Sequence, residues 1–537
     1  MSRPNPVKLA VFLVGLIAIT GLPVLVKGGL FITNFEGDAL HLADIVLRMA
    51  EGGRPHLDFF TPVGGLAFWP VVLGLEAGGG LGRAFGVGQL VFALGAGGAV
   101  WWAAVSRLPV RLAYLFAAVS GILLTSLSHG ASGAMVAVSM HYNRWAWVLA
   151  FVAVILVLLP PKGHPRPLVD GGILAGVLAA MALLKATYVA CFFPVLLLIA
   201  ILRRDMALLK ASLVAGGMLA ALLSVVLGPA YIAAYTGDLW TATQAPLRDQ
   251  PGLGLSDVAI SPPYLVGTLA LLAGMAFLRR AGAQTEGLSL LLLLPAFIAV
   301  TWQNFGNDPV WLALAGILLF ALRPPRRPDL PPERDPSVGV AAAGFAALVL
   351  AVPLLQNHAS GGVRLLTADV SSYRLLVPDR AGMGDVFMPT LPAELVRGRV
   401  NLSDPGEPYE TAESSAGADH APREFQGATL PKCQILTGIP TTLAALETDL
   451  AAAERPVFVA DLISSHWLYG PGGPLPGGAP WNYGTLNGVA AAGHVLVPLC
   501  PIDTRARGAI LEAIVEEAIP LSLVRETALY RLYKIGG

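Results

Sequence analysis

A run of acidic and polar residues follows the first apolar stretch of the chain, and these residue types can do proton chemistry. The run begins Asn34-Phe35-Glu36-Gly37-Asp38-Ala39-Leu40-His41 and reaches Asp58 before Pro62. Carboxylates beside a membrane are costly to hold there, so they call for a functional explanation. A carboxylate in this place can take the proton of an attacking hydroxyl group. We therefore predict that Asp38 is a catalytic base and that Glu36 and His41 belong to the same site.

Asp38 also has a simpler interpretation, because the residues after it have helical spacing. Asp44 and Arg48 stand four residues apart, and Gly52 follows the last helical position. Asp is a favoured residue at the N-cap of a helix, so Asp38 could cap this one. A cap and a catalytic base are compatible roles.

Lys185 interrupts two apolar runs, Met181 to Leu184 and Ala186 to Val189. A lysine between two helices can simply extend its amine to the membrane surface. Positive charge, however, gathers on the cytoplasmic side of membrane proteins, and the topology below places Lys185 on the other side. A cation there suits a phosphate ligand.

Three further polar groups are candidates for binding a substrate. His141, Tyr142 and Arg144 precede an apolar run, where they form either an interfacial belt or, through Arg144, part of a phosphate site. Gln303, Asn307 and Asp308 either cap two helix ends or hydrogen-bond sugar hydroxyls. Asp58 either orders its own loop or binds an acceptor or a metal. A divalent cation held by Glu36, Asp38 and Asp58 stays open as a cofactor, although no metal-binding motif is present.

The composition decides the class of protein that must position these residues. Of 537 residues 55% are hydrophobic and 13% are charged, which is typical of a polytopic membrane protein. The formal net charge is zero, so nothing indicates nucleic-acid binding. Apolar stretches predict eleven transmembrane helices, near 9–30, 86–104, 111–128, 144–160, 168–184, 186–202, 211–233, 262–278, 287–303, 307–322 and 338–355.

The segment 66–81 is also apolar, and the distribution of basic residues decides how it lies. If it does not span, five clusters of basic residues all fall on the cytoplasmic side: Arg107 and Arg111; Lys162 and Arg166; Arg203, Arg204 and Lys210; Arg279 and Arg280; and Arg323, Arg326 and Arg327. We therefore predict a helix at the outer interface for 66–81. The acidic loop 31–65 and the chain from about 356 onward then lie outside, which is the periplasmic side of an inner membrane. Residues 1–355 form the transmembrane domain in this prediction.

Residues 356–537 are more polar and predict a separate extracytoplasmic α/β domain. Buried strands are expected at 457–460 and 494–499, a helix at 505–518, and closing strands at 521–524 and 528–533. A mobile loop is expected near 400–425. Cys433 and Cys500 either form a disulfide or stay as two free, buried thiols.

The acidic loop, the interfacial helix after it and the plan of many spans with an outer C-terminal domain resemble the GT-C glycosyltransferases. The resemblance implies transfer of a sugar from a polyprenyl-phosphate donor to an extracytoplasmic lipid, glycan or protein. It implies that Asp38 activates the acceptor and that Lys185 or Arg144 stabilises the leaving phosphate. The paired Asp-Glu of the mannosyltransferase branch is replaced here by Glu36-Gly37-Asp38.

Two other functions fit the composition. A lipid or glycan transporter would place polar groups near the bilayer midplane, often in repeated halves. The polar groups of this chain gather at one face instead, and no repeat is visible. An inactive relative that serves as a scaffold in envelope assembly is the third alternative.

Overall fold

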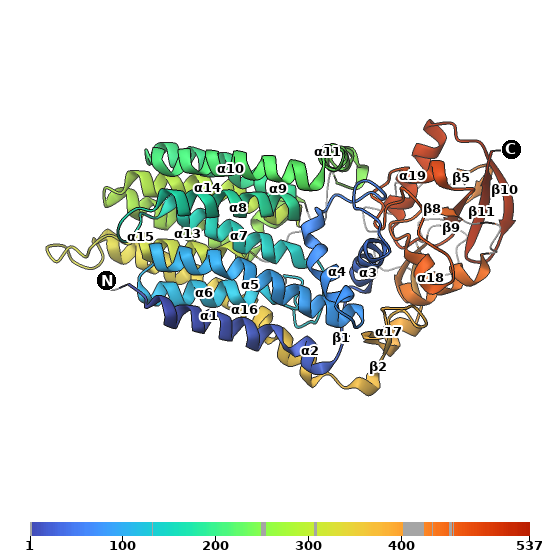
Figure 1. The fold of residues 1–537 in the computed structure, drawn as a ribbon, viewed down its shortest axis with the longest axis horizontal. Coiled ribbons are helices and arrows are strands. Elements are labelled where there is room, and N and C mark those ends of the chain that lie inside the picture. The colour runs from blue at the N-terminus through green and yellow to red at the C-terminus, as the bar shows by residue number, and fades with distance from the viewer. Residues whose placement is uncertain are drawn as a thin grey trace.

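A bundle of long apolar helices carries a mixed α/β domain at one end (Figure 1). The computed structural model describes residues 3–130, 133–248, 254–304, 309–400, 424–431, 433–450, 454 and 456–536. Within these ranges, eight helices are long and apolar enough to cross a membrane, and three shorter apolar helices lie among them. Together they match the eleven predicted spans in order. The prediction of a polytopic helical membrane protein with a C-terminal α/β domain is confirmed.

The bundle is built around one central helix. α7 is buried along almost its whole length, whereas α10 lies at the edge with most of its surface exposed. The helices of the bundle are α1 and α2 (Pro6–Gly21 and Pro23–Lys27), α5 (Leu81–Arg107), α6 (Val110–Leu124), α7 (His141–Leu158), α8 (Pro167–Leu184), α9 (Ala186–Leu202), α10 (Met206–Leu227), α13 (Pro262–Arg280), α14 (Gln284–Gln303), α15 (Trp311–Leu322) and α16 (Pro336–Thr367).

The last helix of the bundle is longer than the sequence predicts. α16 begins where Asp335 caps the amide of Ser337 at 2.9 Å, and it continues to Thr367 instead of ending near 355. The predicted helix ends near residue 355 because the apolar run of the sequence ends there. The added turns are amphipathic, and they bury Asn357 and His358 against the bundle.

Two shorter helices lie between the bundle and the C-terminal domain (Figure 1). α3 (Glu36–Ala50) carries the acidic residues of the first loop, and α4 (Trp69–Glu76) follows a single 3-10 turn at Gly65–Ala67. With eight residues, α4 is only about 12 Å long, which is far too short to cross a bilayer. The prediction that 66–81 does not span is therefore confirmed.

The polar segments predicted to lie on one side of the membrane meet at one end of the bundle. The amide of Thr33 donates to the carbonyl of Val136 at 2.8 Å, and the amide of Gly64 donates to the carbonyl of Leu184 at 3.0 Å. α11 (Pro229–Gln244) joins them, because Asp238 accepts a hydrogen bond from His56 at 2.8 Å. The C-terminal domain lies at this same end, and the N-terminus lies at the opposite end (Figure 1).

The C-terminal domain contains a four-stranded sheet in the order β10-β11-β9-β8 (Leu521–Glu526, Tyr530–Ile535, His494–Pro498 and Val457–Val459). β8 and β9 are parallel and the other pairs are antiparallel. α18 (Ile439–Asp449) and α19 (Thr504–Glu516) complete the fold. Every strand and helix that the sequence predicts after residue 456 is present within a few residues of its predicted bounds.

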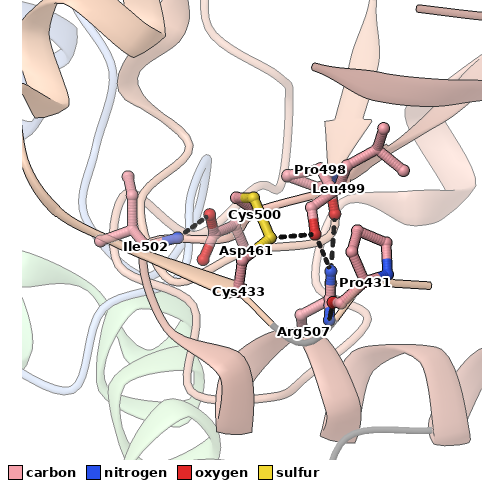
Figure 2. Close-up of a disulfide and its surroundings, with 8 residues drawn as sticks. All are labelled: Pro431, Cys433, Asp461, Pro498, Leu499, Cys500, Ile502 and Arg507. Atoms are coloured by element: carbon pink, nitrogen blue, oxygen red, sulfur yellow. Dashed lines mark hydrogen bonds between the residues drawn. A yellow bond between two sulfur atoms is a disulfide. The ribbon is translucent and has the colours of Figure 1, made fainter. Parts of the chain in front are cut away.

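Two links, one a disulfide and the other a pairing of strands, connect distant parts of the chain. Cys433 and Cys500 form a disulfide, which decides between the two alternatives for these cysteines (Figure 2). β1 (Leu30–Phe31) pairs in parallel with β3 (Val386–Pro389), so the first loop is joined to the chain that follows α16. The predicted loop 400–425 lies almost wholly outside the described residues.

Candidate active site

Asp38 lies inside the first turn of α3 and does not cap it. The helix begins at Glu36, and the preceding Phe35 has a left-handed backbone with φ of 66° and no side-chain cap. The interpretation of Asp38 as an N-cap is therefore wrong, because the helix starts at Glu36, three residues before the Ala39 start that this role requires. The ring of Phe35 stacks on His129 at 4.6 Å between ring centroids, and this packing holds the uncommon backbone conformation.

The carboxyl group of Asp38 is placed where its ionised form is poorly solvated. Burial raises the pKa of Asp38 to about 7; Ser139 partly offsets this effect, and the nearby charge of Glu36 adds to it. A carboxyl group with this pKa exchanges its proton near neutral pH. Such a group has the property that a general base needs at physiological pH.

A buried cation lies on the other side of Ser139. Arg144 donates from one guanidinium nitrogen to the carbonyl of Ser139 at 3.0 Å and from the other to the carbonyl of Ser126 at 3.2 Å. Its side chain is 3% exposed. In the part of the chain that the structure describes, no ion pair includes Arg144. A buried guanidinium held by neutral carbonyls keeps its full charge available to an anion.

Lys185 occupies the break between α8 and α9, as predicted, and it is largely buried there. Its amine donates a hydrogen bond to the side-chain oxygen of Asn304 and lies 5.7 Å from the ring centroid of Tyr142. The amide nitrogen of Asn304 in turn lies 3.4 Å from the hydroxyl of Tyr188. Lys185 is therefore held in a network that reaches from α7 to the end of α14.

An apolar cavity of about 620 Å³ opens beside this lysine, between α8, α9 and α10. Ala182 and Leu183 line it just before Lys185, and Tyr235 closes the same end. The rest of its lining is almost entirely aliphatic. The cavity has the shape and chemistry to hold a hydrocarbon chain whose polar end reaches Lys185.

The other predicted substrate-binding residues on α7 and after α14 lie in different surroundings. His141 is buried and its Nε2 lies 2.9 Å from the carbonyl of Ala67, so it fastens α7 to the turn before α4. Gln303 is half-buried at the last position of α14, and its neighbour Asn304 contacts Lys185 instead. Asn307 and Asp308 lie outside the described residues.

His41 and Asp58 each contact residues outside the first turn of α3. His41 packs edge-on against Trp481 of the C-terminal domain at 5.1 Å. Asp58 accepts hydrogen bonds from the backbone and side chain of Arg54 at 2.8 and 3.2 Å, and these bonds lower its pKa. Within the described residues, no group of three or more His, Cys, Asp or Glu side chains is arranged to hold a metal ion.

Sequence reasoning missed several polar residues of this region. His358 on α16 lies 2.6 Å from the hydroxyl of Ser126. Asn357 donates to Ser128 at 2.8 Å. These serines lie in the loop after α6, which has no pattern that marks it for function. Only the polar pair Asn357-His358 at the end of an apolar run could have indicated a contribution from α16.

Comparisons with known proteins give a likeness in structure but none in sequence. No protein-family model matches the chain, and no curated protein matches it by sequence. Two solved structures of ArnT from Cupriavidus metallidurans are similar to it over 97% of both chains. The apo structure has a TM-score of 0.44 and 12% identity. The structure bound to undecaprenyl phosphate has a TM-score of 0.41 and 11% identity.

Proposed function

We propose that this protein is a membrane glycosyltransferase of the GT-C type. It transfers one sugar from a polyprenyl-phosphate donor to a lipid, glycan or protein acceptor on the outer side of the membrane. The observation that carries this proposal is the position of Asp38, whose raised pKa suits a base and whose neighbour Ser139 also contacts the buried cation Arg144. A base and a phosphate-binding cation are the two groups that the reaction needs.

The reaction balances with these groups. The acceptor hydroxyl oxygen attacks the anomeric carbon of the donor sugar while the bond from that carbon to the phosphate oxygen breaks. The phosphate leaves with the bonding electron pair, and Asp38 takes the proton of the acceptor hydroxyl. Arg144 and Lys185 stabilise the negative charge that grows on the phosphate. Because a phosphate is a good leaving group, the site needs no strong acid.

The donor binds with its lipid tail in the apolar cavity between α8, α9 and α10. Ala182 and Leu183, just before Lys185, line one part of the cavity, which supports a donor whose phosphate lies towards that lysine. The C-terminal domain covers the other face of α3 through Trp481 and His41. The disulfide of Cys433 and Cys500 supports a location of the domain outside the cytoplasm.

The experiment that tests this function measures release of polyprenyl phosphate by the purified full-length chain. Labelled polyprenyl-phosphate sugars are supplied with membrane extract as the source of acceptors. The wild type and Lys210→Gln, which removes a lysine at the far end of the bundle, should both release the lipid phosphate. Lys185→Gln should bind the donor at least tenfold more weakly, because a charge-assisted contact to the phosphate is lost.

The same assay separates the rival functions. A transporter would bind the donor and move it between leaflets of a vesicle without cleaving it. A scaffold would neither bind nor cleave it. Either result from a folded wild-type protein, over a panel of donor sugars, would overturn the proposal.

A further inference from the structure

A second polar cavity lies at the end of the bundle opposite the C-terminal domain. It has a volume of about 300 Å³ and is formed by the start of α1, the end of α5 and the connection from α7 to α8. The proposed transferase site uses none of its residues. Its main lining residues are Arg3, Trp101, Trp102, Arg107, Lys162 and Arg166.

The charge in this cavity is strongly unbalanced. Four cationic side chains line it against one carboxylate, that of Asp170. The two oxygens of Asp170 are already occupied, because one accepts from Arg107 at 2.8 Å and the other from Trp102 at 2.7 Å. Among the described residues, no ion pair includes Arg3, Lys162 or Arg166. The positive charge of these three side chains is therefore not neutralised by the protein.

The cations are brought together by specific packing. The guanidinium group of Arg3 lies against Gly163, where a Cβ atom would be 2.1 Å from one of its nitrogens. Arg166 lies 5.7 Å from the ring centroid of Trp102. Burial and the neighbouring charge of Arg3 both lower the pKa of Lys162. Like charges held this close repel one another unless an anion joins them.

One buried donor in this wall also lacks a partner. Arg107 is 4% exposed, and its Nε makes no hydrogen bond. Buried donors of charged groups are costly to leave unsatisfied. An anion in the cavity would supply the missing negative charge next to this guanidinium group.

We propose that this cavity binds the phosphate group of an anionic membrane lipid. Two indole rings line it, and tryptophan favours the depth of lipid headgroups. Leu168 and Val169 at the start of α8 are 81% and 42% exposed, so apolar surface for acyl chains adjoins the charged cavity. Basic pockets between transmembrane helices recognise acidic headgroups by this combination of contacts. The bound lipid would join the start of α1 to the connection between α7 and α8.

The test is native mass spectrometry of the full-length protein with added dioleoyl phosphatidylglycerol or dioleoyl phosphatidylcholine. The wild type should retain phosphatidylglycerol in preference to phosphatidylcholine. Lys162→Gln combined with Arg166→Gln should weaken phosphatidylglycerol binding about 30-fold, since charges near a membrane surface contribute roughly additively. Arg326→Gln combined with Arg327→Gln removes the same charge from an exposed segment outside the cavity, and it should bind like the wild type.

Three results would overturn the proposal. They are equal binding of the two lipids, equal loss in both double variants, and unchanged binding when Lys162 and Arg166 are replaced. Displacement of the lipid by millimolar inorganic phosphate would assign the cavity to a free anion instead. If the double variant does not fold, Arg166→Gln alone replaces it, because Arg166 is exposed and its side chain makes no cap hydrogen bond to α8.

Discussion

The indole nitrogen of Trp467 donates a hydrogen bond to the carboxylate of Asp44 at 2.7 Å. Trp467 belongs to the C-terminal domain and Asp44 to α3, and both side chains are buried. Arg48 holds the other carboxylate oxygen and donates at 3.0 Å to the carbonyl of Leu475 in the same domain. The C-terminal domain is thus fastened to the helix that carries Asp38, about two to three turns along from that residue.

This contact predicts that the docking of the domain is sensitive to a small change. Trp467→Phe keeps most of the ring but removes the donor, which leaves one oxygen of a buried carboxylate unsatisfied. We expect a loss of about 1–3 kcal/mol in the free energy of unfolding. Circular dichroism during thermal unfolding measures it. The control Trp240→Phe, at a position that is 69% exposed, should change little; equal effects of the two variants would contradict the contact's role.

The raised pKa of Asp38 predicts how stability depends on pH. Its folded pKa of about 7 lies above its ordinary value of 3.8, so the folded protein holds this proton more tightly than the unfolded chain does. Stability from this group is therefore complete below the ordinary value and is lost as pH rises towards 7. Asp38→Asn cannot ionise, so its melting temperature minus that of the wild type should increase across this window. A difference that is independent of pH would show that the carboxyl group is well solvated.

The disulfide leads to predictions about the stability of the C-terminal domain and about the compartment in which it lies. Cys433 and Cys500 close a loop with a sequence separation of 67 residues, and this loop carries Trp467 and Trp481, which contact α3. The combined change Cys433→Ser and Cys500→Ser should lower the free energy of unfolding of the domain by about 4 kcal/mol. When isolated membranes are denatured in a labelled maleimide without reductant, only Cys191 should be labelled. Labelling of all three cysteines would place the domain in a reducing compartment.

The close packing at Gly64 links the first loop sterically to the break that holds Lys185. A Cβ atom there would lie 2.0 Å from the carbonyl oxygen of Leu183, so Gly64→Ala must push the loop away from α8. We expect destabilisation of about 1–3 kcal/mol. Gly172→Ala is the matched control, since nothing lies within 4 Å of its Cβ position in α8. It should stabilise the helix slightly. A tolerated Gly64→Ala would mean that the two segments are not in close contact.

Most of the fold could be predicted from the sequence, because the patterns that mark helices and strands are local. Apolar length marks each span, and the bias of arginine and lysine distinguishes the spanning runs from 66–81. Short continuous apolar runs likewise mark the buried strands β8 and β9. The end of α16 was missed because its last turns are amphipathic and fall outside any count of apolar residues.

The candidate site was only partly predictable, because contacts between distant segments leave no local pattern. Glu36-Gly37-Asp38 and Lys185 stand out as charges beside apolar runs. The contacts of Arg144 with the carbonyls of Ser126 and Ser139, and of Trp467 with Asp44, depend on how separate elements pack. The role of Asp38 as a helix cap was wrong because helix starts are uncertain by a few residues in sequence.

The central claim is that Asp38 is the base of a sugar transfer, and the most direct test is the transfer rate as a function of pH. Purified wild type, Asp38→Asn and Glu51→Gln are supplied with a labelled polyprenyl-phosphate sugar and membrane extract. Glu51 follows the same helix and pairs with Arg380, so its variant controls for loss of a carboxylate. We predict that wild-type and Glu51→Gln rates rise with pH to a plateau with a midpoint near 7, while Asp38→Asn transfers no label although it is folded and binds donor. Transfer by Asp38→Asn at the wild-type rate would contradict the account.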